Sequence, residues 1–86
     1  LIQLNNEAFD IVPNPFLNHL QFVGDLSGII NAEVSICDAS GRIVFLQKIN
    51  NLSSLIDTQN LKPGIYQLSV KTREKLYRKR FVKTTE

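Results

Sequence analysis

Short stretches in which apolar and polar residues alternate recur along most of the chain. A period of two places successive side chains on opposite faces of an extended strand, whereas an amphipathic helix repeats its apolar positions every three to four residues. No window of a dozen residues carries a clean helical stripe. The pattern therefore predicts strands separated by turns. Seven strands are expected, over residues 8–12, 17–23, 32–37, 42–49, 54–57, 65–72 and 75–83.

Glycine, proline and aspartate mark the turns between these strands. Asp38-Ala39-Ser40-Gly41 places Asp first and Gly fourth, which predicts a type I turn with a glycine bulge and hence a hairpin. Lys62-Pro63-Gly64-Ile65 places Pro second and Gly third, which predicts a type II turn. The apolar run at residues 43–46 lies on both faces of its strand, which favours burial on both sides. Seven short strands joined by such turns predict an all-β fold, an immunoglobulin-like antiparallel β-sandwich.

The segment Pro13-Asn14-Pro15 separates the first two strands. Proline has no backbone N–H to give to a sheet, so one strand should end at Val12 and the next should begin near Leu17. A residue that precedes proline favours extended backbone, and we expect the segment to cross from one sheet to the other. A ligand-binding loop is the alternative, but the neighbouring sequence offers no catalytic partner for it.

The last expected strand is rich in basic residues. Its two faces hold Tyr77, Lys79 and Phe81 on one side, and Leu76, Arg78, Arg80 and Val82 on the other. A solvated edge whose lysines deter aggregation is one interpretation, and a strip that binds an acidic partner, a nucleic acid or an anionic surface is the other. Nucleic-acid binding would need aromatic and basic residues interleaved on one open face, and this strand meets that need only superficially. No nucleic acid is expected as a partner.

Length, composition and charge add limits to this picture. The 86 residues, 43% hydrophobic and 21% charged, suit one small globular domain. The longest apolar run is four residues, so no transmembrane segment is expected. Residues 71–86 contain seven basic and two acidic residues, whereas residues 1–70 contain three basic and six acidic ones. The positive charge is therefore concentrated at the C-terminal end.

Residue types that support catalysis or metal binding are sparse. His19 and Cys37 are the only histidine and cysteine, so the chain cannot form an internal disulfide or supply four zinc ligands. Cys37 is interpreted as a small apolar residue, with an intermolecular bridge or a reactive thiol as the alternative. Tyr66 either fills core volume or donates its hydroxyl to the backbone near Asn60 or Leu61, as a tyrosine corner does. We expect no enzyme, catalytic residue, cofactor or metal.

Four motifs in a fixed order resemble a known family. They are Pro13-Asn14-Pro15, ICDASGRIV over residues 36–44, LKPGIYQLSV over residues 61–70 and YRKRFVK over residues 77–83. Each motif alone is common, but their order and spacing resemble the C-terminal sorting domain of proteins exported by the type IX (Por) secretion system of Gram-negative bacteria. The resemblance implies a sorting domain over residues 9–86 and a linker from a preceding cargo domain over residues 1–8.

The resemblance also implies which residues carry the sorting motifs. Matched by position, they are Pro13, Asn14, Pro15, Asp38, Gly41, Arg42, Gly64, Tyr66, Lys79, Arg80, Phe81, Val82 and Lys83. In the family the basic terminal strand carries much of the export signal. The chain departs from the family pattern at Val12, where tyrosine is frequent, at Cys37, where tyrosine or asparagine is frequent, and in the three residues that follow Lys83.

A route for the parent protein follows from the same resemblance. It implies transit through the periplasm and delivery to the outer-membrane translocon, with shuttle proteins of the secretion system and a cell-surface sortase as partners. The sortase would remove the domain, and the cargo would be secreted or held at the outer-membrane surface, often on anionic lipopolysaccharide. One alternative is a structural or carbohydrate-binding immunoglobulin-like module of a surface protein. Another is an uncleaved sorting-type domain that serves as a docking part of the secretion machinery.

Overall fold

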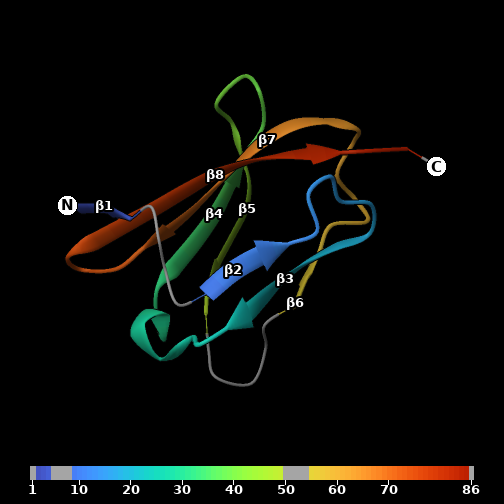
Figure 1. Cartoon of the computed structure of the whole chain (residues 1–86). Coiled ribbons are helices and arrows are strands. Elements are labelled where there is room, and N and C mark those ends of the chain that lie inside the picture. The colour runs from blue at the N-terminus through green and yellow to red at the C-terminus, as the bar shows by residue number, and fades with distance from the viewer. Residues whose placement is uncertain (1, 5–8, 50–54, 86) are drawn as a thin grey trace.

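Two β-sheets face each other across one apolar core (Figure 1). The computed structural model describes residues 2–4, 9–49 and 55–85. The larger sheet has the strand order β1-β8-β7-β4-β5, and the smaller has the order β2-β3-β6. The elements are β1 (Ile2–Leu4), β2 (Phe9–Val12), β3 (His19–Gly24), the 3-10 helix η1 (Ser27–Ile29), β4 (Glu33–Cys37), β5 (Ile43–Lys48), β6 (Leu55–Asp57), β7 (Gly64–Lys71) and β8 (Lys75–Lys83). The predicted all-β sandwich is confirmed.

The seven strands predicted from the sequence correspond to β2 to β8, and their ends agree within two residues, while the predicted starts at residues 8 and 54 lie outside the described residues. β1 is an additional strand that the alternation pattern does not signal. It is three residues long and pairs in parallel with β8, with Ile2 opposite Lys75, whereas the other pairs of named strands are antiparallel. Within the expected linker over residues 1–8, positions 1 and 5–8 lie outside the described residues.

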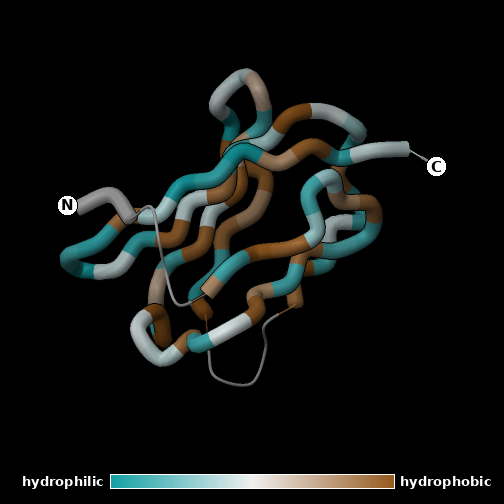
Figure 2. The backbone as a smooth tube through the Cα atoms, viewed as in Figure 1, coloured by the Kyte–Doolittle hydropathy of each residue, from teal (hydrophilic) through white to brown (hydrophobic). Residues whose placement is uncertain are grey.

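The core is built from the inward-facing residues of both sheets, and in β2, β7 and much of β8 these alternate with residues that face outward (Figure 2). In β2, for example, buried and exposed positions alternate without exception. Six of the seven aromatic side chains are buried, namely Phe9, Phe16, Phe22, Tyr66, Tyr77 and Phe81. The Phe16 ring meets the rings of Tyr66 and Phe81 edge-on, with centroids 6.1 Å and 6.3 Å away. This aromatic cluster joins the segment after β2 to strands β7 and β8.

Strand β5 differs from its expected burial. The apolar run favoured burial on both faces, but Ile43 and Leu46 are 57% and 58% exposed, and only Val44 and Phe45 pack in part against the core. The strand order explains the difference, because β5 is the edge strand of the larger sheet. No second layer covers its outward face in the described residues.

The type II turn expected at Lys62–Ile65 is wrong. Gly64 has φ +156° and is the first residue of β7, opposite Lys83, whereas a type II turn needs φ near +80° at this position. The hydrogen-bonded turn lies earlier, where the Leu61 N–H donates to the Thr58 carbonyl at 3.1 Å. Pairing with β8 extends β7 back to Gly64, and this long-range pairing overrides the local turn preference.

The segment Pro13-Asn14-Pro15 ends β2 at Val12, as predicted, but the expected crossing between sheets is wrong. β2 and β3 are antiparallel neighbours in the same sheet, and the segment connects them. Both of its X–Pro peptide bonds are cis. The connection reaches toward the larger sheet, where Phe16 forms an isolated bridge with Lys83 in β8. The connection therefore contacts the larger sheet, although the two strands that it joins both belong to the smaller one.

Candidate functional site

Strand β8 is the element around which the motif residues gather. Along one edge it pairs with the whole of β7, from Gly64 opposite Lys83 to Lys71 opposite Leu76. Along its other edge, β1 pairs with residues 75–77. Beyond β1 this outer edge is covered by residues 14–16 of the β2–β3 connection.

The side chain of Asn14 bonds to β8 as the backbone of a neighbouring strand would. Its Nδ2 donates to the Arg80 carbonyl at 3.0 Å, and its Oδ1 accepts from the Val82 N–H at 3.1 Å. Phe16 continues the ladder, because its N–H donates to the Val82 carbonyl and its carbonyl accepts from the Thr84 N–H. An open strand edge would leave these backbone groups free to pair with another chain. Asn14 of the first motif and the adjoining Phe16 therefore occupy the outer edge of β8, the strand that contains the fourth motif.

Lys83 is buried by the same arrangement and is only 7% exposed. Its Nζ donates to the Thr58 carbonyl at 2.8 Å and to the Leu17 carbonyl, and it lies 5.6 Å from the centroid of the Phe16 ring. A buried ammonium group is tolerated when protein acceptors replace its water. Lys83 thus ties the end of β8 to the β2–β3 and β6–β7 connections.

Lys79 also points toward the opposite sheet. Its Nζ donates to Oδ1 of Asp10 in β2 at 3.1 Å and lies 5.4 Å from the Phe81 ring centroid. The pKa of Asp10 is lowered, first by the hydrogen bond from the Ile11 N–H and then by the bond from Lys79. Since both side chains retain contact with solvent, the ion pair contributes at most about 1 kcal/mol. It nevertheless gives Lys79 a partner within the fold.

Tyr66 fills core volume and also makes the hydrogen bond expected of a tyrosine corner. It is 7% exposed, and its hydroxyl donates to the Lys62 carbonyl at 2.5 Å. The acceptor lies one or two residues beyond the expected positions, Asn60 and Leu61. The bond holds the segment that precedes β7 close to the start of that strand.

The turn between β4 and β5 has the predicted form. Gly41 has φ +90°, and its N–H donates to the Asp38 carbonyl at 2.9 Å. Oδ1 of Asp38 accepts from the Ser40 hydroxyl at 2.6 Å and from the N–H groups of Ser40 and Arg42 at 3.0 Å. The Ser40 hydroxyl, followed by these N–H groups and the Arg42 charge, lowers the pKa of Asp38 below its ordinary value. The Asp38 carboxylate therefore makes its hydrogen bonds within its own turn.

These contacts predict a loss of stability in acid. The pKa values of Asp10 and Asp38 are lowered in the folded state. The pKa of Asp25 is lowered as well, because its Oδ1 accepts from the Ser27 N–H at 3.0 Å. An unfolded Asp titrates near pH 3.9. Stability from a lowered pKa is fully present above the unfolded value and is lost as pH falls through the folded value. We expect the unfolding free energy, measured with urea from pH 7 to pH 2, to fall below about pH 4. Asp38→Asn should flatten this fall, and an unchanged slope in that variant would contradict the assignment.

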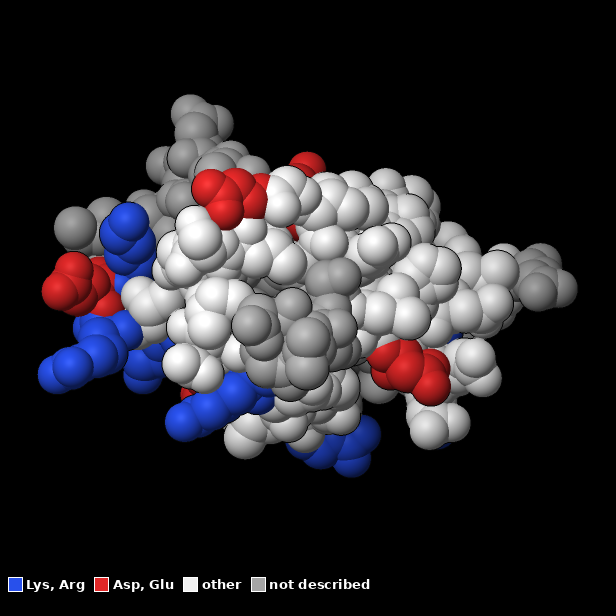
Figure 3. Space-filling model, turned by 90° about the horizontal axis from the view of Figure 1, so that it is seen from below, with Lys and Arg blue, Asp and Glu red and all other residues white. Residues whose placement is uncertain are grey.

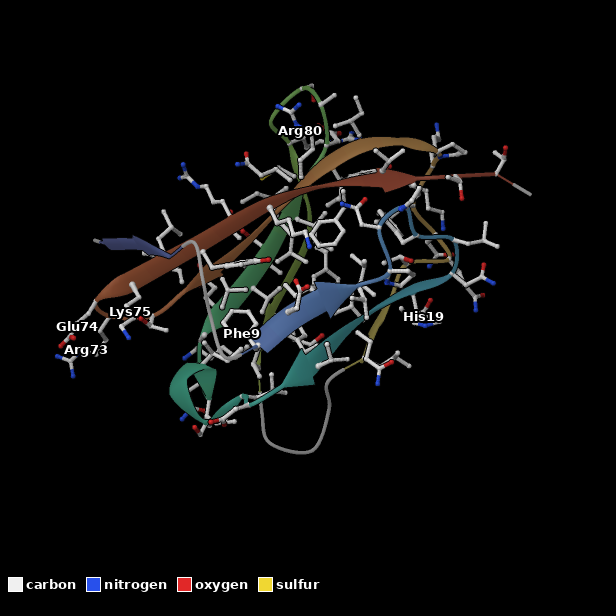
Figure 4. The ribbon with its side chains drawn as sticks, viewed as in Figure 1. Phe9, His19, Arg73, Glu74, Lys75 and Arg80 are labelled. Atoms are coloured by element: carbon white, nitrogen blue, oxygen red, sulfur yellow. The ribbon has the colours of Figure 1, made fainter. Side chains whose placement is uncertain are left out.

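The outward face of β8 borders a groove of about 720 Å³. Its walls include Arg78 and Arg80 of β8, Ile65 and Gln67 of β7, and Asp38 and Ala39 of the β4–β5 turn. An adjoining hollow of about 250 Å³ shares the turn and Ile65 and extends to Gly64. Figure 4 shows Arg80 beside the β4–β5 turn, at the opposite end of the larger sheet from Arg73, Glu74 and Lys75. The groove is where the second, third and fourth motifs meet.

The motif residues thus fall into two groups. Asn14, Lys79, Phe81 and Lys83 are engaged in contacts within the fold, whereas Arg80 and the exposed Val82 present their side chains outward. Two further residues of this region, Arg78 and Asp10, were not among the motif residues predicted from the sequence. Arg78 alternates with Arg80 on the outward face, a signal present in the sequence. Asp10 meets Lys79 across 69 positions, and no local pattern signals that contact.

The face seen from below, in Figure 3, carries separate acidic groups on a largely uncharged surface. Basic side chains in this view gather toward the end that carries the β7–β8 turn in Figure 1.

The histidine and the cysteine do not line the groove. His19 is exposed in β3, and Cys37 is half-buried in β4. Among the described residues, no three His, Cys, Asp or Glu side chains cluster as a metal site would need. None of the helical residues described forms a span long and apolar enough for a membrane.

Comparison with known proteins adds one match. A family model described as the secretion system C-terminal sorting domain matches residues 10–84, which is most of the chain. The search of curated proteins returned no match. The matched range includes all four motifs and ends one residue beyond Lys83.

Proposed function

Since the chain belongs to the type IX secretion system family of C-terminal sorting domains, we propose that it addresses a parent protein from the periplasm to the outer-membrane translocon. In this proposal a shuttle or translocon component recognises the folded domain, and a cell-surface sortase then removes it. The parent is released or attached at the cell surface, where anionic lipopolysaccharide is its anchor. The domain acts by binding and has no catalytic role.

The observation that carries this proposal is the convergence of the four motifs on β8. Asn14 of the first motif bonds to the backbone of Arg80 and Val82 in the fourth. The groove beside Arg80 is lined by Asp38 of the second motif and Tyr66 of the third. Residues that are far apart in sequence therefore support one strand and one surface. A receptor that reads this surface would read the folded domain rather than a linear peptide.

The carbohydrate-binding alternative finds little support in the side chains. Sugar rings stack on exposed aromatic side chains, but six of the seven aromatic residues here are buried and Phe45 is partly buried.

An uncleaved domain that docks within the secretion machinery is the other alternative, and it would use the same surface as a cleaved sorting domain. Mass spectrometry of the surface-located parent separates these two fates, because residues 1–86 are lost in one and retained in the other.

Transfer of the domain to an unrelated protein tests the proposal. Residues 1–86 are fused behind a periplasmic reporter in a bacterium with a type IX system, and the reporter is followed by protease accessibility on intact cells. We expect surface delivery with the domain and periplasmic retention without it. Retention of the fusion that carries the folded domain would contradict the proposal.

Deletion of residues 79–86 from the same fusion should trap the reporter in the periplasm. The deletion removes Phe81 and Lys83, which are both buried, so it disrupts the sandwich as well as the surface of β8. Normal surface delivery of the truncated fusion would contradict a role for the terminal strand. The transfer experiment is therefore the primary test, because it keeps the domain intact.

A further inference from the structure

We propose that the groove beside β8 binds an extended acidic segment of a partner protein, whose carboxylates at alternate positions meet Arg78 and Arg80. This inference rests on the proposed sorting function and names the chemistry of the partner for that surface. The groove has a volume of about 720 Å³ and lies between the outward face of β8 and the β4–β5 turn. It is open to solvent.

The charge of the groove is the first argument. Arg78 and Arg80 are exposed, and the ion pairs found among the described residues involve neither of them. Asp38 is the acidic residue that lines the groove, and its carboxylate is already bonded to Ser40 and paired with Arg42 at 3.3 Å. The groove therefore presents two positive charges that the described part of the domain does not neutralise.

The spacing of the two arginines is the second argument. Residues two apart on a strand project from the same face and are about 6.6–6.8 Å apart along it. Alternate residues of an extended peptide have the same spacing, so two carboxylates of such a peptide match the two guanidinium groups. Arginine binds carboxylates through two parallel N–H···O bonds, which makes this match geometrically specific.

The neighbouring strand β7 completes the surface. Ser69 lies opposite Arg78, and Gln67 lies opposite Arg80. Gln67 lines the groove and is exposed, so its amide can hydrogen-bond to a peptide backbone. At the end of the groove Ile65 is 52% exposed and offers an apolar contact. Because β8 is already paired by β7 and by Asn14, the partner binds through these side chains rather than as an added strand.

An anionic lipid surface is the competing occupant. Membrane attraction grows with the number of basic residues near the surface. Arg73 and Lys75, two exposed basic residues at the β7–β8 turn and the start of β8, lie at the far end of the sheet from Arg80 (Figure 4). A pair of charges within a walled groove suits a peptide better than it suits a flat membrane.

Binding of a defined peptide to the intact 86-residue domain provides the test. The probe is a fluorescent ten-residue peptide with Glu at every second position and Thr between, and its control has Gln in place of Glu. Fluorescence anisotropy should show binding of the Glu peptide that weakens with added salt. Arg78→Gln with Arg80→Gln should weaken it roughly tenfold, since two exposed ion pairs, each of modest strength, are lost together. Amide NMR shifts should concentrate at Gln67, Arg78 and Arg80.

The matched control removes two charges at the other end of the same strand region, with Arg73→Gln and Lys75→Gln. All four residues are exposed, so both double variants should melt like the parent domain. Equal weakening by the two double variants, or no binding of the Glu peptide, would overturn the inference. Binding to phosphatidylglycerol vesicles with no binding to the peptide would also overturn it, in favour of a lipid surface.

The export assay separates failure of this inference from failure of the sorting function. If the intact domain delivers the reporter and the Arg78→Gln, Arg80→Gln fusion does so equally well, the groove inference fails while the sorting function stands. If the intact domain delivers nothing, the sorting function itself fails. Selective loss of delivery in the groove variant, with the control variant delivered normally, supports the inference.

Discussion

Replacing Lys83 with methionine should lower the free energy of unfolding by about 2–4 kcal/mol, which is the range for buried hydrogen bonds to a charged group whose partners are left unsatisfied. Methionine fills much of the same space beside Phe16 but cannot donate to the carbonyls of Thr58 and Leu17. For a domain of this size the melting temperature should fall by roughly 10–20 °C. Thermal unfolding followed by circular dichroism measures the change.

The matched control for this prediction is Lys75→Met. Lys75 begins the same strand but is exposed, so its replacement should change the unfolding free energy by less than about 0.5 kcal/mol. Equal melting of the Lys83 variant and the parent domain would show that its ammonium group is not a structural donor. If Lys83→Met also blocks export, the loss should be partly recovered at a lower temperature, because the cause is unfolding rather than a missing receptor contact.

Replacing Asn14 with alanine should lower the unfolding free energy by about 1–2 kcal/mol, since two hydrogen bonds are lost at a site that water can reach. The local effect should be larger than the global one. Hydrogen exchange of the Val82 amide should become much faster, because its acceptor is Oδ1 of Asn14. Exchange of the Leu68 amide in the centre of β7 should change only with the global stability.

Asn18→Ala is the control for the Asn14 variant, because Asn18 lies in the same connection and its side chain is exposed. It should leave the exchange of Val82 unchanged. Asn14→Asp is a useful second variant, since its carboxylate still accepts from Val82 but no longer donates to the Arg80 carbonyl. An Asn14→Ala domain whose Val82 amide stays protected would contradict the proposed pairing of the segment with β8.

The parts of the fold that depend on local sequence were predictable. Alternation located β2 to β8, and it placed Tyr77 and Phe81 together on one face of β8, which the structure shows to be the buried face. Proline placed the end of β2, and the Asp38–Gly41 pattern placed the hairpin turn. In each case the residues that determine the feature lie within a few positions of one another, so their preference appears directly in the chain.

The parts that depend on distant pairing were not predictable in the same way. β1 is short, and its partner in β8 lies more than seventy positions away. The edge position of β5 follows from strand order, which the alternation of a single strand does not contain. The preference of Pro63-Gly64 for a turn was overridden because β7 gains backbone pairs with β8 by starting at Gly64.

The candidate site shows the same division. The motif residues were found in the sequence, but whether each one supports the fold or faces a partner depends on the tertiary structure. Lys83 shares the two-residue period of Tyr77, Lys79 and Phe81, so its inward direction was available from the pattern. The hydrogen-bond acceptors of Lys83 could not be predicted from the pattern, because they are backbone carbonyls in two distant connections.

The parallel pairing of β1 with β8 has a mechanical consequence. Ile2 lies opposite Lys75, the first residue of β8, whereas Thr84 follows the last residue of β8, so the two lie toward opposite ends of this strand. The strands β1 and β8 run in the same direction (Figure 1). A pulling force applied between these ends therefore acts along the strands and across their hydrogen bonds, which are loaded together in shear rather than opened one after another. The Asn14 and Phe16 bonds share the load farther along β8. In the proposed sorting function, this geometry would let the domain transmit tension between a parent protein and a secretion apparatus while it keeps its fold.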